Sequence, residues 1–127
     1  MKIRTLAAPA LAAALLASCA DMSLSIVCPS VPVPALAISV LDGPGERSLA
    51  AAAWGWYEVG TRRDSLRYGS GHSGDFLLAD GPPGVYAVEV HVAGHAPWSA
   101  RAAVESNECG PATVRLTAAP ERLDDAT

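Results

Sequence analysis

The chain has 127 residues, half of them hydrophobic, which is enough for one small domain and leaves no room for a second. Nine basic and 13 acidic residues give it a formal net charge of −4. This balance argues against nucleic acid or an anionic lipid surface as the binding partner.

Residues 1–18 have the pattern of an export signal. A short cationic start, Met1 to Arg4, precedes an apolar run from Leu6 to Ala17. This run is shorter than the roughly 20 apolar residues that a transmembrane helix needs. We therefore expect a signal peptide that is removed, rather than a helix that spans a membrane.

The tetrapeptide Leu16-Ala17-Ser18-Cys19 ends this segment and resembles the lipobox of bacterial lipoproteins. The resemblance implies cleavage before Cys19 and acyl chains on that cysteine, which would anchor the protein to a membrane of the cell envelope. Since Ala20 follows instead of aspartate, the same class implies the outer membrane, on either face. The alternative is an ordinary secretory signal with an incidental cysteine.

Removal of residues 1–18 would leave a mature chain of 109 residues (127 − 18) with seven arginines, no lysine and a net charge of −6 (7 − 13). Residues 19–34 would then form a tether that Pro29, Pro32 and Pro34 keep extended. At the other end, residues 119–127 are predicted to be a short disordered tail. The folded body lies between these segments, at residues 35–118.

Seven stretches of this body have the pattern of β-strands. Apolar and polar side chains alternate along them, and glycine- or proline-rich turns separate them. The predicted strands are 35–41, 52–59, 65–68, 76–78, 85–93, 97–106 and 112–117. Seven short strands in one small domain predict an all-β fold, a sandwich of two sheets.

The segment Asp80-Gly81-Pro82-Pro83-Gly84-Val85-Tyr86, followed by Gly94-His95, resembles carboxypeptidase regulatory-like domains. The resemblance covers residues 35–118 and implies a seven-stranded, Greek-key-type β-sandwich of the transthyretin or prealbumin type. Proline fixes one turn dihedral and glycine permits the other, so Tyr86 should enter its strand facing the core. Gly110-Pro111 departs from the family pattern and should delay the last strand.

Three cysteines in an oxidising compartment would leave one thiol without a disulfide partner, unless one cysteine is chemically modified. With Cys19 acylated, Cys28 and Cys109 remain. Two thiols in an exported domain of this size are expected to form a disulfide bond. Two buried free thiols are the alternative.

Nothing in the sequence points to a catalytic, metal or cofactor site. His91 and His95 share a strand but lie roughly 13 Å apart at about 3.3 Å per residue, too far to bind one metal ion. The glycine-rich segment 69–74 lacks the lysine and the helix of a phosphate-binding loop. Polar residues crowd this segment, which we expect to be a mobile connection unable to hold catalytic geometry. They are Ser70, His72, Ser73 and Asp75.

Trp54 and Trp56 are the candidate binding residues. They lie two apart, so in a strand both rings share one face, where they could stack on sugars or on a partner protein. Their side of the sheet is ambiguous, because Glu58 shares it and Val59 shares the opposite side with Tyr57. Large aromatic residues in a small domain are usually partly buried, which favours the core for both tryptophans.

Two further residue groups have simpler expectations. Trp98 lies on the apolar side of its strand and is predicted to join the core. Arg62-Arg63-Asp64 is predicted to be a solvated turn.

Two functions are compatible with these features. The first is a non-enzymatic accessory or protein-interaction module, anchored through Cys19 and binding another envelope protein. The alternative is a carbohydrate-binding module that uses Trp54 and Trp56. Exposure of both rings in one patch would favour carbohydrate, and burial would favour the interaction module.

The first prediction concerns the mature amino terminus. Mass spectrometry of the protein from a bacterial envelope should find residues 1–18 absent and acyl chains on Cys19. An unmodified Cys19, together with free thiols at Cys28 and Cys109, would contradict both the anchor and the disulfide.

Overall fold

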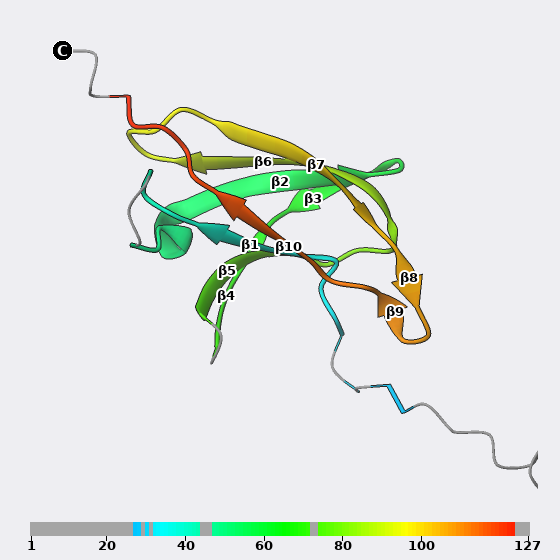
Figure 1. The fold of residues 1–127 in the computed structure, drawn as a ribbon. Helices are drawn as coiled ribbons and strands as arrows, with labels where there is room; N and C mark the ends of the chain where they lie inside the picture. Colours follow the sequence, from blue (N-terminus) through cyan, green and yellow to red (C-terminus); the bar gives the residue numbers. More distant parts are fainter. Residues whose placement is uncertain (1–26, 29, 31, 44–46, 72–73, 124–127) are drawn as a thin grey trace, which may run out of the picture.

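A computed structural model describes residues 27–28, 30, 32–43, 47–71 and 74–123. In this part of the chain, strands make up two four-stranded sheets and a short hairpin, and the helical structure is limited to one 3-10 turn, η1 (Ala50–Ala52). The two sheets are the layers of a sandwich (Figure 1). The prediction of an all-β fold with two packed sheets is confirmed.

The first sheet contains both the first and the last long strand of the domain. Its order is β10 (Val114–Ala118), β1 (Leu36–Val40), β5 (Gly74–Ala79) and β4 (Arg67–Gly71). β1 runs parallel to β10 and antiparallel to β5. Four of the five residues of β1 are buried, because this strand lies inside the sheet.

The second sheet is antiparallel throughout and carries the candidate binding residues. Its order is β3 (Arg62–Ser65), β2 (Ala53–Val59), β6 (Gly84–Val92) and β7 (Trp98–Val104). A two-stranded hairpin, β8 (Ser106–Asn107) with β9 (Gly110–Pro111), lies between β7 and β10 in the sequence. Figure 1 shows this hairpin at the opposite end of the sandwich from η1.

Two tyrosines are the largest side chains that are fully buried between the sheets, Tyr57 on β2 and Tyr86 on β6. Their ring centroids lie 5.5 Å apart. Each hydroxyl donates a hydrogen bond to a backbone carbonyl of the β5–β6 connection, Tyr57 to Asp80 at 2.8 Å and Tyr86 to Pro82 at 2.6 Å. Burial raises the pKa of both hydroxyls, so both stay protonated and able to donate.

The turn before β6 behaves as the sequence predicts. Gly84 has φ of +151°, a conformation that side chains with a Cβ rarely adopt. Tyr86 follows two residues later and is completely buried. The predicted inward orientation of Tyr86 is therefore confirmed.

Two connections differ from the sequence prediction. Arg62–Ser65 is strand β3 at a sheet edge, not a solvated turn, although all four of its residues are exposed. The glycine-rich segment is part of a hairpin, because Ser70 pairs with Asp75 across β4 and β5. His72 and Ser73 lie outside the described residues.

The end of the domain also departs from the prediction. Residues 106–107 form a separate strand, and Gly110-Pro111 pairs with it, so the last long strand begins at Val114. The delay at Gly110-Pro111 was expected, whereas the hairpin was not. Residues 119–127 were predicted to be a disordered tail, but the first part of this segment is packed against the domain. Pro120 is buried. The backbone of Glu121 accepts a hydrogen bond from Ala96, and that of Leu123 donates one to Gly94.

Cys28 and Cys109 form the predicted disulfide, with their Cα atoms 5.2 Å apart. The hydroxyl of Thr113 also donates a hydrogen bond to the carbonyl of Pro34, at 2.6 Å. The end of the predicted tether is therefore fastened to the segment before β10. The predicted signal peptide and Cys19 lie outside the described residues, and within those residues no helix is long and apolar enough to cross a membrane.

The disulfide should contribute measurably to stability. Replacing both Cys28 and Cys109 with serine should lower the free energy of unfolding by about 3 kcal/mol, because the bond closes a long loop in the unfolded chain. Urea unfolding followed by tryptophan fluorescence measures the difference. Reductant should destabilise the natural protein and leave the double variant unchanged; equal midpoints for the two proteins would contradict the prediction.

Candidate functional site

The outer face of the second sheet carries Trp54 and Trp56. On β2, the side chains of Tyr57 and Val59 are buried, whereas Trp54 is 56% exposed and Trp56 is half-buried. The expectation that both rings belong to the core is therefore wrong. Trp98 is half-buried and packs against the core, in agreement with its predicted position.

A close approach between β2 and β6 explains why a glycine separates the two tryptophans. A Cβ atom at Gly55 would lie 2.0 Å from the backbone oxygen of Glu89, far inside any allowed contact. The pairing of these strands sets Trp54 opposite His91 and Trp56 opposite Glu89. Gly55 thus permits the strand pairing that assembles the outer face.

Trp54 forms a stacked pair with His91. The two rings lie 4.4 Å apart and nearly parallel, at 11°. His91 stacks on one face of the indole, and Trp54 as a whole is still 56% exposed, so much of the ring remains accessible to a ligand. His91 is held in turn by Glu89, whose Oε2 atom lies 2.6 Å from the imidazole Nε2. Trp54 is therefore an exposed flat ring whose orientation is set before any ligand binds.

Trp56 lies beside this pair. Its ring is 6.1 Å from that of Trp54 and 5.0 Å from that of His91, tilted in both cases. The guanidinium of Arg63, on edge strand β3, lies 4.8 Å from the centre of the Trp56 ring, a cation–π contact. We call Trp54, Trp56 and His91, with Glu89 and Arg63 as their supports, the aromatic platform.

A hollow of about 430 Å³ adjoins the aromatic platform on the same face of the sheet. Its lining joins β2, β6 and β7 and includes Val88 and Ala100. The other lining side chains are one aromatic ring, two carboxylates, a guanidinium, a hydroxyl and a methyl group. They belong to Trp56, Glu58, Glu89, Arg101, Ser99 and Ala87.

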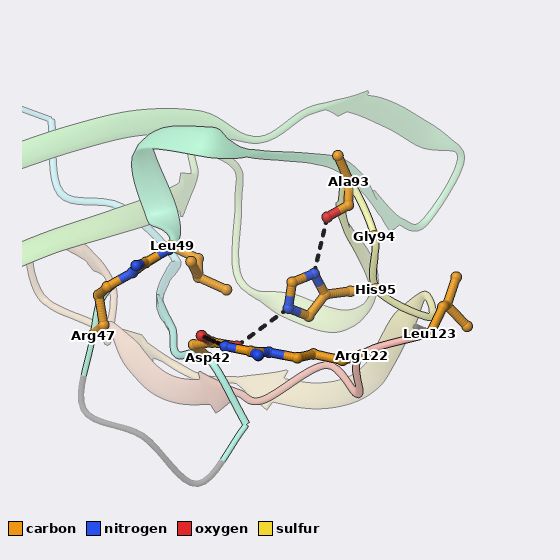
Figure 2. A pocket seen from close by; sticks show the side chains of 8 residues that line it. All are labelled: Asp42, Arg47, Leu49, Ala93, Gly94, His95, Arg122 and Leu123. Atoms are coloured by element: carbon orange, nitrogen blue, oxygen red, sulfur yellow. Dashed lines mark hydrogen bonds and ion pairs between the residues drawn. The ribbon is translucent and has the colours of Figure 1, made fainter. Parts of the chain in front are cut away.

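A second hollow, of about 500 Å³, lies at the end of the sandwich near η1 (Figure 2). Asp42, just after β1, is at its centre. Nε of Arg122 donates a hydrogen bond to Oδ1 of Asp42 at 3.0 Å, and a second bond joins the guanidinium to Oδ2. His95 lies between Asp42 and the backbone, with Nδ1 donating to the carbonyl of Ala93 at 3.0 Å and Nε2 3.3 Å from Oδ1 of Asp42.

These contacts fasten three distant segments together: the end of β1, the turn between β6 and β7, and the segment after β10. Hydrogen bonds from Arg122, and then from His95, hold the pKa of Asp42 well below its usual range. A carboxylate this fully engaged by the protein has little capacity left for a ligand. We interpret the second hollow as a structural clasp.

The other candidates from the sequence are not brought together. His91 contacts Trp54 and Glu89, whereas His95 contacts Asp42. Among the described residues, no three histidine, cysteine, aspartate or glutamate side chains are grouped so that they could hold a metal ion.

Sequence reasoning missed the residues that support the tryptophans. His91 and Glu89 fall on the polar side of an alternating strand, a signal of a solvent-facing position. Their contacts with Trp54 depend on the pairing of β2 with β6, which the sequence does not specify. Arg63 was missed because a charged edge strand lacks the apolar alternation by which strands are recognised.

Comparison with known proteins adds no assignment: no protein family, curated protein or solved structure matches this chain.

The Asp42 clasp predicts a dependence of stability on pH. A carboxyl whose pKa is lowered by folding stabilises the fold above its unfolded pKa, about 3.9, and loses this contribution as the pH falls toward its folded pKa. Asp42→Asn should therefore lower the urea midpoint at pH 7, and the gap to the natural protein should narrow progressively below about pH 4.

Asp75→Asn is the matched control. No ion pair of Asp75 is found among the described residues, so this substitution should leave the midpoint nearly unchanged across the same pH range. A gap between Asp42→Asn and the natural protein that stays constant down to pH 2 would contradict the proposed role of the carboxylate.

Proposed function

We propose that this chain is a non-enzymatic, lipid-anchored binding module of a bacterial envelope, and that the outer face of its second sheet binds polysaccharide. The choice of ligand rests on one observation: Trp54 is exposed while its indole is stacked on His91. The sequence alone favoured a protein-interaction module. The exposed aromatic platform now favours carbohydrate.

The chemistry of the platform suits a sugar ring. The axial hydrogens of a pyranose form a flat, weakly apolar surface that packs on an indole, and its hydroxyls require hydrogen-bond partners at the rim. Glu89 and the hollow beyond Trp56 supply such partners within the same face. Because the Glu89–His91 pair already orients Trp54, binding loses little side-chain entropy at this ring.

The proposal includes the anchor and the finer fold. Acylation of Cys19 would place the domain at the envelope, probed by the mass spectrometry described above. A Greek-key sandwich of the transthyretin type, as in carboxypeptidase regulatory-like domains, is supported by the chain's repeated exchange between the two sheets. The exchanges follow β1, β3, β5 and β7.

The binding function is tested by retention of the purified full-length protein on cellulose, chitin and peptidoglycan sacculi. We expect retention on at least one of them. Trp54→Ala should weaken it by about tenfold or more, the effect of losing a central aromatic contact worth about 2 kcal/mol.

Tyr68→Ala is the matched control, because Tyr68 is also an exposed aromatic residue but lies on β4 of the other sheet. It should bind as the natural protein does. Absence of retention on all three polysaccharides, or equal losses in the two variants, would refute carbohydrate binding at this face. If carbohydrate binding is refuted and one envelope protein is recovered with this chain in stoichiometric amount, a protein-interaction module becomes the favoured function.

A further inference from the structure

The hollow beside Trp56 exists because a small side chain, that of Ala87, lies among larger ones. Ala87, on β6, lies between Glu58 on β2 and Arg101 on β7, its direct neighbours across the two strand pairs. The next row of the sheet is Trp56, Glu89 and Ser99. A methyl group at the centre, with longer side chains around it, leaves a depression in an otherwise continuous surface.

Besides Glu89, three polar side chains line this hollow. Among the residues that the structure describes, the side chains of Glu58, Ser99 and Arg101 make no hydrogen bond or ion pair. They offer, respectively, an acceptor, a group that both donates and accepts, and a donor. This mixture matches the hydroxyl groups of a sugar, each of which can donate and accept.

The charge of the hollow favours an uncharged ligand. Its lining contains the two carboxylates of Glu58 and Glu89 and the single guanidinium of Arg101. Arg63 is the direct neighbour of Glu58 across the β2–β3 pair and lies over the Trp56 ring, so the positive and negative side chains at the hollow balance. A glycan with a carboxylate or sulfate on every unit would therefore find no net positive charge to attract it here.

Distance decides how many sugar units are involved. Trp54 and Glu58 lie four residues apart on one strand, which corresponds to about 13 Å at roughly 3.3 Å per residue. This span is longer than one pyranose ring. A unit stacked on Trp54 and a unit seated over Ala87 must therefore be different units of one chain.

We propose that the hollow over Ala87 is a second subsite, which holds one uncharged sugar unit while a neighbouring part of the same chain stacks on Trp54, so that the ligand is a neutral oligosaccharide. This inference rests on the proposed function and adds the size and charge of the ligand. Glu58 accepts from ring hydroxyls, and Arg101 and Ser99 donate to them from the opposite side.

The test uses the full-length protein with defined sugars, by isothermal titration calorimetry. The neutral probes are glucose, N-acetylglucosamine, cellohexaose, maltohexaose and chitohexaose, and the anionic probe is hexagalacturonate. At least one neutral hexasaccharide should bind about tenfold or more tightly than its monosaccharide. Hexagalacturonate should bind more weakly than that hexasaccharide.

The deciding variant is Ala87→Leu, which fills the hollow without a change of charge. It should lose about tenfold in affinity for the neutral hexasaccharide and little for the monosaccharide. Ala103→Leu is the matched control: Ala103 is an exposed alanine on β7 that does not line the hollow. It should bind like the natural protein, and thermal unfolding of both variants shows whether either has lost its fold.

A second pair of variants tests the hollow without a change in side-chain size. Glu58→Gln should weaken hexasaccharide binding by about tenfold, the usual size of a lost charge-assisted hydrogen bond. Glu105→Gln, at an exposed position just beyond β7, should not.

The outcomes separate this inference from the proposed function. Hexasaccharide binding that Ala87→Leu and Glu58→Gln leave intact, or a preference for hexagalacturonate, would overturn the neutral second subsite while carbohydrate binding stands. Failure of the natural protein to bind any of the six probes, and any of the three polysaccharides above, would overturn both.

Discussion

The hydroxyl groups of Tyr57 and Tyr86 fix which side of the second sheet faces outward. Each tyrosine is buried and donates to a carbonyl of the β5–β6 connection. Because side chains alternate along a strand, a shift of β2 by one residue would bury Trp54 and expose Tyr57, and the half-buried carbonyl of Asp80 would lose its hydrogen-bond donor. The two hydrogen bonds therefore hold the strand with the tryptophans outward, and the aromatic platform depends on that orientation.

Part of this arrangement could be read from the sequence and part could not. The alternation of Val88, Val90 and Val92 with polar residues gave β6 correctly, because one face of the strand is fully buried. On β2 the alternation fails at Gly55, which lies on the buried side yet contributes no apolar side chain. The sequence therefore did not decide which face of the sheet Trp54 lies on. The general tendency of large aromatic residues to be buried predicted the core, and this prediction was wrong.

The residues that support Trp54 were still harder to predict from the sequence. Stacking on His91 requires β2 and β6 to be paired in one register, a long-range property set by the core. β3 was missed for a related reason: it is exposed on both faces, so burial imposes no pattern on it, and backbone pairing with β2 alone defines it. Sequence patterns record burial, and the candidate site is made of groups that are not buried.

The disulfide has a consequence for how far the domain can stand from a membrane. Cys28 is joined to Cys109 in the β8–β9 hairpin, which lies at the end of the sandwich opposite η1 (Figure 1), while the Asp42 clasp lies near η1 (Figure 2). With an acyl anchor at Cys19, nine residues would connect lipid to this fixed point, a reach of at most about 30 Å for extended chain. Without the disulfide, the tether would extend to Pro34, which Thr113 holds, and would lengthen from nine residues to 15 (34 − 19). With the disulfide formed, the domain would stay within a thin layer next to the bilayer. A glycan strand would then have to enter that layer to be bound.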